Sequence, residues 1–160
     1  MPHYENSGVF VVKGNSAVIK INLTMGTRSL THFVEEGETL ATIYRQYDGY
    51  LSGHGNDLAE FLKGFNVVNG YSGDTTNQAN GMGCLTAQFI AHIKEGCGNI
   101  YLYPPNSEDC WEEYTYSVYL KDNQLNIKAV ATNDKKVVFE GTPEELLDKN
   151  LLTIKNEDNA

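Results

Sequence analysis

The segment GTRSLTHFVEEGETLATIYRQYDG, residues 26–49, constrains the fold most, because it predicts a β-hairpin. Two runs rich in β-branched and aromatic residues flank the turn-forming sequence EEGE. If Glu35 faces Glu38 across the turn, Arg28 lies directly opposite Arg45 on the neighbouring strand. These are the only two arginines of the chain, so the hairpin predicts that both lie on one face.

Helical spacing of apolar residues begins after the hairpin, at Asn56, and recurs over residues 82–95, which end at Gly96. The intervening residues 64–83 are rich in Gly, Asn and Thr, which indicates a long loop that is either functional or disordered. The remaining elements are predicted to be strands over residues 100–103, 114–120, 125–131 and 137–140, and a short helix capped by Thr142 with Pro143 and Glu145 behind it.

A length of 160 residues suits one domain, and the chain contains neither an internal repeat nor a linker. The sequence predicts a single α+β domain over residues 1–160, with an antiparallel β-sheet, two main helices packed on one face and a short C-terminal helix. Residues 25–154 form the predicted core and residues 155–160 a flexible tail. Residues 1–24 contain VFVVKGNSAVIKINL, which predicts a strand hairpin or an arm that packs on a second subunit.

The formal net charge of −9 argues against broad binding to nucleic acid or to an anionic membrane, since both require clustered cations. No apolar run approaches the length of roughly 20 residues that spans a bilayer. The N-terminus lacks the pattern of a secretory signal, and the three cysteines form no CxxC pair. We therefore expect a cytoplasmic protein without a membrane partner, and a homo-oligomer is possible.

The paired arginines predict an anion site. Like charges opposite one another are destabilising unless an anion or carboxylates lie between them, and arginine forks suit phosphate or carboxylate. Two alternatives remain open. Asp48 or a glutamate neutralises the pair structurally, or a three-residue turn slides the register and moves one arginine to the other face.

A second anion-binding element is predicted where Gly53-His54-Gly55 precedes the helix that starts near Asn56. A helix N-terminus offers unpaired N–H groups, and flanking glycines let a ligand approach the backbone. The next helix start, at residues 80–83, repeats the arrangement, with the long loop before it as a candidate lid. A plain connection between strand and helix explains the same glycines.

Other chemistry centres on the same stretch. His54 beside Asp48 is a candidate acid/base pair, although the sequence places no obvious nucleophile near it. Tyr47 shares the strand face of Arg45 and is a candidate stacking surface for a nucleobase, whereas Tyr44 faces the other way into the core. No recognisable spacing of His and Cys predicts a metal site or a cofactor.

The segments TRS-T at residues 27–31, ATIYRQYDGYLSGHGNDLAEFL at 41–62 and NGMGCLTAQFIAHIKEG at 80–96 resemble a family of small uncharacterised proteins of bacteriophages and other viruses. The resemblance covers residues 25–120, and Leu51 stands where the family commonly has proline. It implies a viral accessory protein, which would be located in the host cytoplasm. In this class, small nucleotide-binding proteins sequester host immune signals.

These observations lead to one expectation and two alternatives. We expect a protein that binds a phosphorylated or nucleotide-like small molecule. Its predicted ligand-binding residues are Arg28, Arg45, Tyr47, Asp48, Gly53, His54, Gly55 and Asn56. One alternative is a hydrolase or phosphodiesterase that uses His54 and Asp48. The other is a structural or protein-interaction module without a ligand.

Overall fold

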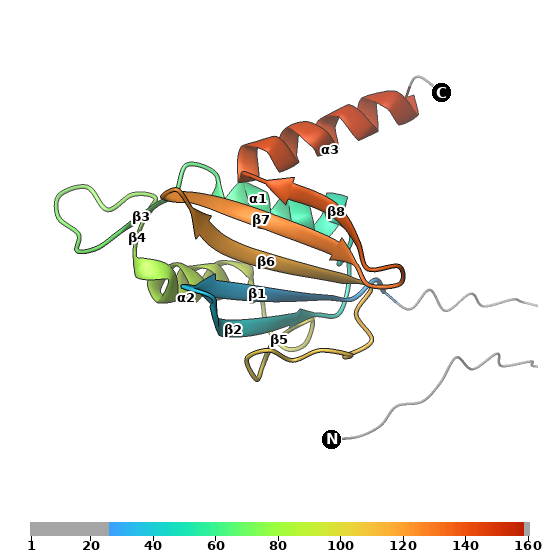
Figure 1. Cartoon of the computed structure of the whole chain (residues 1–160), viewed down its shortest axis with the longest axis horizontal. Helices are drawn as coiled ribbons and strands as arrows, with labels where there is room; N and C mark the ends of the chain where they lie inside the picture. The colour runs from blue at the N-terminus through green and yellow to red at the C-terminus, as the bar shows by residue number, and fades with distance from the viewer. Residues whose placement is uncertain (1–25, 159–160) are drawn as a thin grey trace, which may run out of the picture.

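The computed structural model describes residues 26–158, so the predicted hairpin or arm at residues 1–24 lies outside the described part. A six-stranded sheet with the order β5-β2-β1-β6-β7-β8 forms the centre of the fold (Figure 1). The strands are β1 (Ser29–Glu35), β2 (Glu38–Arg45), β5 (Ile100–Tyr103), β6 (Tyr114–Lys121), β7 (Gln124–Ala131) and β8 (Lys136–Gly141). The helices are the single π-turn η1 (Leu51–Gly55), α1 (Asn56–Leu62), α2 (Gly81–Ile93) and α3 (Pro143–Asp158).

The predicted α+β class is confirmed, but the sheet is mixed rather than antiparallel. β1 pairs with β2 in antiparallel register and with β6 in parallel register. The parallel pair arises because the chain leaves the hairpin, forms the helices and β5, and then crosses back to the far side of β1. The strands β6, β7 and β8 form the predicted meander. No helix of residues 26–158 is long and apolar enough to cross a membrane.

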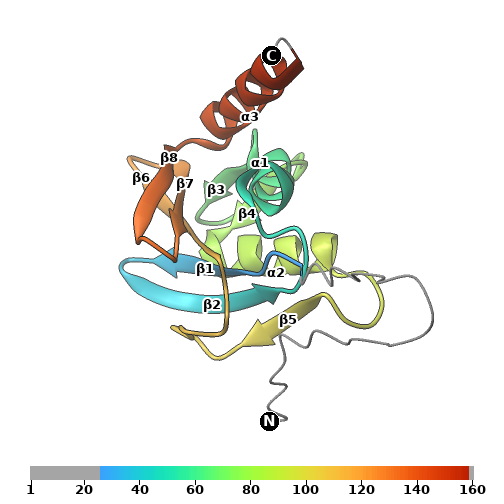
Figure 2. The ribbon, with the colours of Figure 1, turned by 90° about the vertical axis from the view of Figure 1, so that its right-hand side faces the viewer.

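α1 and α2 both lie on one face of the sheet, as predicted (Figure 2). The core between them contains Phe33 and Tyr116 from the sheet and Leu58, Leu85 and Phe89 from the helices, all fully buried. The connection from β5 to β6 crosses the opposite face, where the Arg28 guanidinium donates a hydrogen bond to the carbonyl of Trp111. The hairpin β1–β2 is therefore covered on both faces.

The predicted capping box of the last helix is confirmed. The Thr142 backbone N–H donates to Glu145 Oε2 at 2.8 Å, and the Glu145 N–H donates to Thr142 Oγ1 at 3.3 Å. However, α3 is not short. It continues to Asp158, so residues 155–158 of the predicted tail are helical.

The predicted long loop at residues 64–83 also contains regular structure. β3 (Asn66–Val68) and β4 (Gln78–Asn80) pair in parallel as a separate two-stranded sheet. β4 leads directly into α2. The part of the predicted lid between β3 and β4, residues 69–77, is therefore anchored at both of its ends.

The predicted register of the hairpin is wrong over most of its length. Glu35 does face Glu38, but Leu40 is an extra residue, because Val34 pairs with Thr39 and Phe33 with Ala41. Beyond this bulge every pair shifts by one position, as β-bulges do. Ser29, not Arg28, lies opposite Arg45.

Candidate functional site

The two arginines lie on opposite faces of the hairpin, so the predicted clamp does not form. Arg45 ends β2 on the helix-covered face, where it is 9% exposed. Arg28 precedes β1 and contacts the crossing connection on the other face. There it lies near Tyr44, whose pKa is raised by burial and partly lowered again by the Arg28 charge. The bulge at Leu40 causes this separation, because a one-residue shift moves a side chain to the other face.

Arg45 is held by three groups of the chain. Nε donates to the carbonyl of Tyr47 at 2.7 Å, and Nη1 donates to Asp57 Oδ2 at 2.7 Å and to His54 Nδ1 at 3.1 Å. His54 is fully buried, and its Nε2 lies 2.6 Å from Thr31 Oγ1. Because a guanidinium only donates, Nδ1 must accept, and the ring proton is on Nε2, which donates to Thr31.

This arrangement keeps the His54 imidazole neutral. Burial, with the adjacent Arg45 charge as the smaller cause, lowers the pKa of His54 from 6.5 to about 3. Protonation would place a second cation 3.1 Å from the guanidinium nitrogen and remove the only acceptor of that hydrogen bond. His54 is therefore a buried structural acceptor and donor at neutral pH.

The lowered pKa of His54 predicts a loss of stability in mild acid. In the unfolded chain His54 takes up a proton near pH 6.5, whereas in the folded chain it does so only near pH 3. The unfolded state therefore binds more protons in this window, and the contribution is complete above pH 6.5 and lost as the pH falls toward 3. We expect the free energy of unfolding to fall by about 2 kcal/mol from this group between pH 7 and 5.

Urea unfolding at pH 7, 6 and 5 measures this slope, and His54→Gln should remove most of it. The pKa of half-buried His32 is also lowered by burial, so His32→Gln should remove a smaller share. NMR signals of the His54 ring that change to the protonated form between pH 7 and 5 would contradict the expectation.

The chain itself fills the first predicted backbone anion site and occupies one donor of the second. In the π-turn, the N–H groups of Gly53 and Gly55 donate to the Tyr50 carbonyl, and that of His54 donates to the Asp48 carbonyl at 2.7 Å. At the second predicted site, Glu35 Oε1 accepts a hydrogen bond from the N–H of Met82 in the first turn of α2. Carbonyl oxygens of the chain thus occupy these N–H groups of the first site, and a carboxylate oxygen occupies one N–H group of the second.

The predicted pair of His54 and Asp48 does not form through side chains. Asp48 Oδ1 accepts from the Tyr50 hydroxyl at 3.3 Å, and only its carbonyl contacts His54. Tyr47 is 48% exposed, so its ring is accessible for stacking, but it lies outside the pocket described below. Asn56 begins α1 without a side-chain cap.

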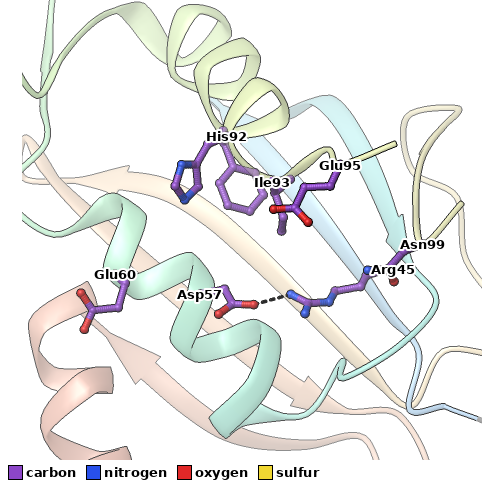
Figure 3. Close-up of a pocket in the computed structure, with 8 residues that line it drawn as sticks. Arg45, Asp57, Glu60, His92, Ile93, Glu95 and Asn99 are labelled. Atoms are coloured by element: carbon purple, nitrogen blue, oxygen red, sulfur yellow. Dashed lines mark hydrogen bonds and ion pairs between the residues drawn. The ribbon is translucent and has the colours of Figure 1, made fainter. Parts of the chain in front are cut away.

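One pocket of about 330 Å³ lies between α1 and α2 (Figure 3). Its lining consists of Arg45, Asp57, Glu60, Phe89, His92, Ile93, Glu95 and Asn99. Arg45 lies at the end of β2, and Asp57 and Glu60 lie on α1. The other lining residues belong to the second half of α2 and to the loop before β5. Of the predicted ligand-binding residues, only Arg45 lines this pocket.

Sequence reasoning missed the carboxylates of this pocket. Asp57 and Glu60 are spaced three apart on one face of α1, a spacing that in the sequence also resembles a capping box. In the structure Asp57 pairs with Arg45, and Glu60 pairs with Lys63 at 2.6 Å. The signal available in the sequence was the pair of carboxylates spaced i,i+3 on one face of a predicted helix.

The pocket lining is acidic overall. Asp57, Glu60 and Glu95 face it against the single cation Arg45, which gives a formal charge of −2 with His92 neutral. Among residues 26–158, no group of three or more His, Cys, Asp or Glu is placed to hold a metal ion.

Comparisons of the chain with protein-family models, curated proteins and solved structures give no match. The resemblance to a viral family therefore stays a prediction from the sequence motifs.

Proposed function

We propose that this protein binds a small molecule with a cationic group in the pocket between α1 and α2. The observation that carries the proposal is the lining itself, in which three carboxylates, one of them paired with Arg45, stand against that single buried arginine. A pocket of about 330 Å³ falls at the lower end of the ~300–1,000 Å³ range of small-ligand sites. The ligand is therefore small, of the size of an amino acid or a diamine.

The hydrogen bonds of Arg45 define how it contributes. Nε and both protons of Nη1 are used by Tyr47, His54 and Asp57. Within residues 26–158, Nη2 is left with two N–H donors. Arg45 therefore offers a ligand one nitrogen rather than a bidentate fork, which fits a carbonyl, hydroxyl or single carboxylate oxygen better than a phosphate.

The rest of the lining supports a cationic group at the other end of the ligand. Glu95 lies at the pocket rim, where it makes no ion pair with another residue of the described chain. Phe89 and Ile93 supply an apolar wall. An amine or guanidinium there is attracted by Glu95, and less strongly by Glu60 because Lys63 already pairs with it, whereas a phosphate is repelled by Glu95.

A phosphorylated or nucleotide-like ligand is the competing class of ligand. In that case the function would be the sequestration of a host immune signal by a viral protein. Of its main supports, the two-arginine clamp is absent from the described residues, and oxygens of the chain occupy the N–H groups of Gly53, His54 and Gly55 and one N–H group at the start of α2. It stays a prediction that rests on the resemblance and on the exposed ring of Tyr47.

A ligand panel tests the proposal. Agmatine, putrescine and arginine represent the cationic class, and AMP, cyclic di-GMP and inorganic phosphate the phosphorylated class. A compound present at 100 times its dissociation constant stabilises the fold by about 2.7 kcal/mol, which thermal unfolding detects. We expect stabilisation by at least one cationic compound and none by the phosphorylated compounds.

A matched pair of variants locates the site. Glu95→Gln and Glu38→Gln remove the same charge, one at the pocket and one on the exposed start of β2. We expect Glu95→Gln to weaken binding of the cationic compound about two- to fivefold, as removal of a partly exposed ion pair does. Glu38→Gln should leave it unchanged. Stabilisation by phosphorylated compounds alone, or equal effects of both variants, would contradict the proposal.

A further inference from the structure

The second half of α3 extends beyond the body of the domain. In its first half Pro143, Leu146 and Asn150 face inward, and Asn150 Nδ2 donates to the Leu51 carbonyl at 3.2 Å. After Asn150, every residue from 151 to 157 is exposed. Figure 1 shows this end of the helix pointing away from the sheet and from α1.

This extended half carries large aliphatic side chains. Leu151, Leu152 and Ile154 are 55%, 62% and 50% exposed. Half-buried Leu147 precedes Leu151 by four residues, and Ile154 follows it by three. Spacing of four and then three puts these residues on a single stripe, with Leu151 at position a and the other two at position d of a heptad.

A two-turn helical extension with such a stripe needs a partner. Short helices are marginal in water unless tertiary contacts bury an apolar face. Single exposed apolar residues are ordinary, but a contiguous cluster marks an interaction surface. The described chain covers the stripe only up to Leu147.

We propose that this stripe is the contact between two copies of the chain, which pair α3 with α3 in antiparallel orientation. The charges of α3 favour this occupant. Its first half contains Glu144, Glu145, Asp148 and Lys149, and its second half contains Lys155, Glu157 and Asp158, so the first half is the more acidic of the two. Asp148 and Lys155 both occupy heptad position e, and position e faces position e of the other helix in an antiparallel pair.

The antiparallel orientation therefore sets Asp148 beside Lys155 of the second copy, twice across the two-fold axis. It also opposes the two helix dipoles. A parallel pair would set the acidic first halves against one another. A membrane surface fits less well, because α3 has five carboxylates and two lysines, and anionic lipids repel such a helix.

Sedimentation equilibrium of the full chain tests the proposal. We expect a reversible dimer at micromolar concentration, weakened at least about tenfold by Leu151→Ser combined with Ile154→Ser, since the stripe then loses two aliphatic side chains. Leu102→Ser is the matched control, because Leu102 is 69% exposed on the edge strand β5. It should change the dimer less than twofold.

A charge exchange tests the orientation. Asp148→Lys alone and Lys155→Asp alone should each weaken the dimer roughly fivefold or more, and the two together should restore it. No restoration in the double variant overturns the antiparallel arrangement.

Three results overturn the dimer itself. The first is a monomer at all concentrations, and the second is an equal loss of dimer affinity with Leu102→Ser. The third is a monomer whose free energy of unfolding is lowered by the Leu151 and Ile154 substitutions, which would mean that the chain covers its own stripe.

Discussion

Replacement of His54 by alanine is expected to lower the free energy of unfolding by about 3–5 kcal/mol, the cost typical of emptying a buried aromatic site. The imidazole is fully buried, and its ring packs edge-on against Tyr116 at a centroid distance of 5.0 Å. Its loss also leaves Thr31 Oγ1 and one N–H of Arg45 without their partner, and unsatisfied buried polar groups cost about 1–3 kcal/mol. Urea unfolding at pH 7 measures the change.

His92→Ala is the control for this measurement. His92 is exposed at the pocket rim, so its removal should change stability by no more than about 0.5 kcal/mol. If His54→Ala costs less than about 1 kcal/mol, or no more than His92→Ala, the buried network with Arg45 is not what holds this part of the fold.

Gly49→Ala is expected to destabilise the fold by about 3 kcal/mol, at the upper end of what overpacking costs. A Cβ at Gly49 would lie 2.7 Å from the Arg28 carbonyl carbon and 2.8 Å from the Ser29 nitrogen. Both are backbone atoms, so neither can rotate away. The Gly49 N–H donates to the Thr27 carbonyl at 2.8 Å, and its carbonyl accepts from the buried Tyr116 hydroxyl at 2.8 Å. Displacement of Gly49 therefore breaks one contact to the segment before β1 and one to β6.

Gly83→Ala is the matched control for the glycine substitution. Gly83 lies in α2, and a Cβ there meets no atom within 4 Å. Alanine should stabilise the helix by about 0.5–1 kcal/mol, because glycine loses more backbone entropy on folding. Thermal unfolding of both variants should give shifts of opposite sign. Shifts of the same sign would mean that close backbone approach at Gly49 is not limiting.

The network around His54 also bears on the proposed ligand site. His54, Tyr47 and Asp57 together hold the guanidinium of Arg45, so its remaining nitrogen has a defined position in the pocket. Precise donors lose less entropy when a ligand binds. Residues of the stretch YRQYDGYLSGHG thus position Arg45, whereas Asp57, Glu60 and Glu95 line the pocket in which we propose that the ligand binds.

Several local features were predictable from the sequence because their causes are local. The turn after Glu35, the meander from Tyr114 onward and the capping box at Thr142 each depend on residues only a few positions apart. Alternation, turn chemistry and capping are short-range effects. The α+β class followed from the order of these elements.

The site was less predictable because it depends on one residue in a strand. The bulge at Leu40 shifts the pairing of β1 with β2 by one residue, so Arg28 lies on the face opposite to Arg45. The sequence near Leu40 contains no turn-forming residues that would predict this bulge. The parallel pairing of β1 with β6 likewise depends on a connection of many residues. Neither is a short-range property, so a register extrapolated from the turn fails beyond the bulge.

By itself the sequence determined most of the strands and helices, where the hairpin turns and how α3 begins, because backbone preferences and apolar periodicity act over a few residues. Only the tertiary structure decided that Arg28 and Arg45 lie on opposite faces, that His54 is buried and neutral, and that carboxylates of α1 meet Arg45. These outcomes depend on strand register, burial and competition for hydrogen-bond donors. Each is a property of residues distant in sequence, and it exists only after packing has brought them together.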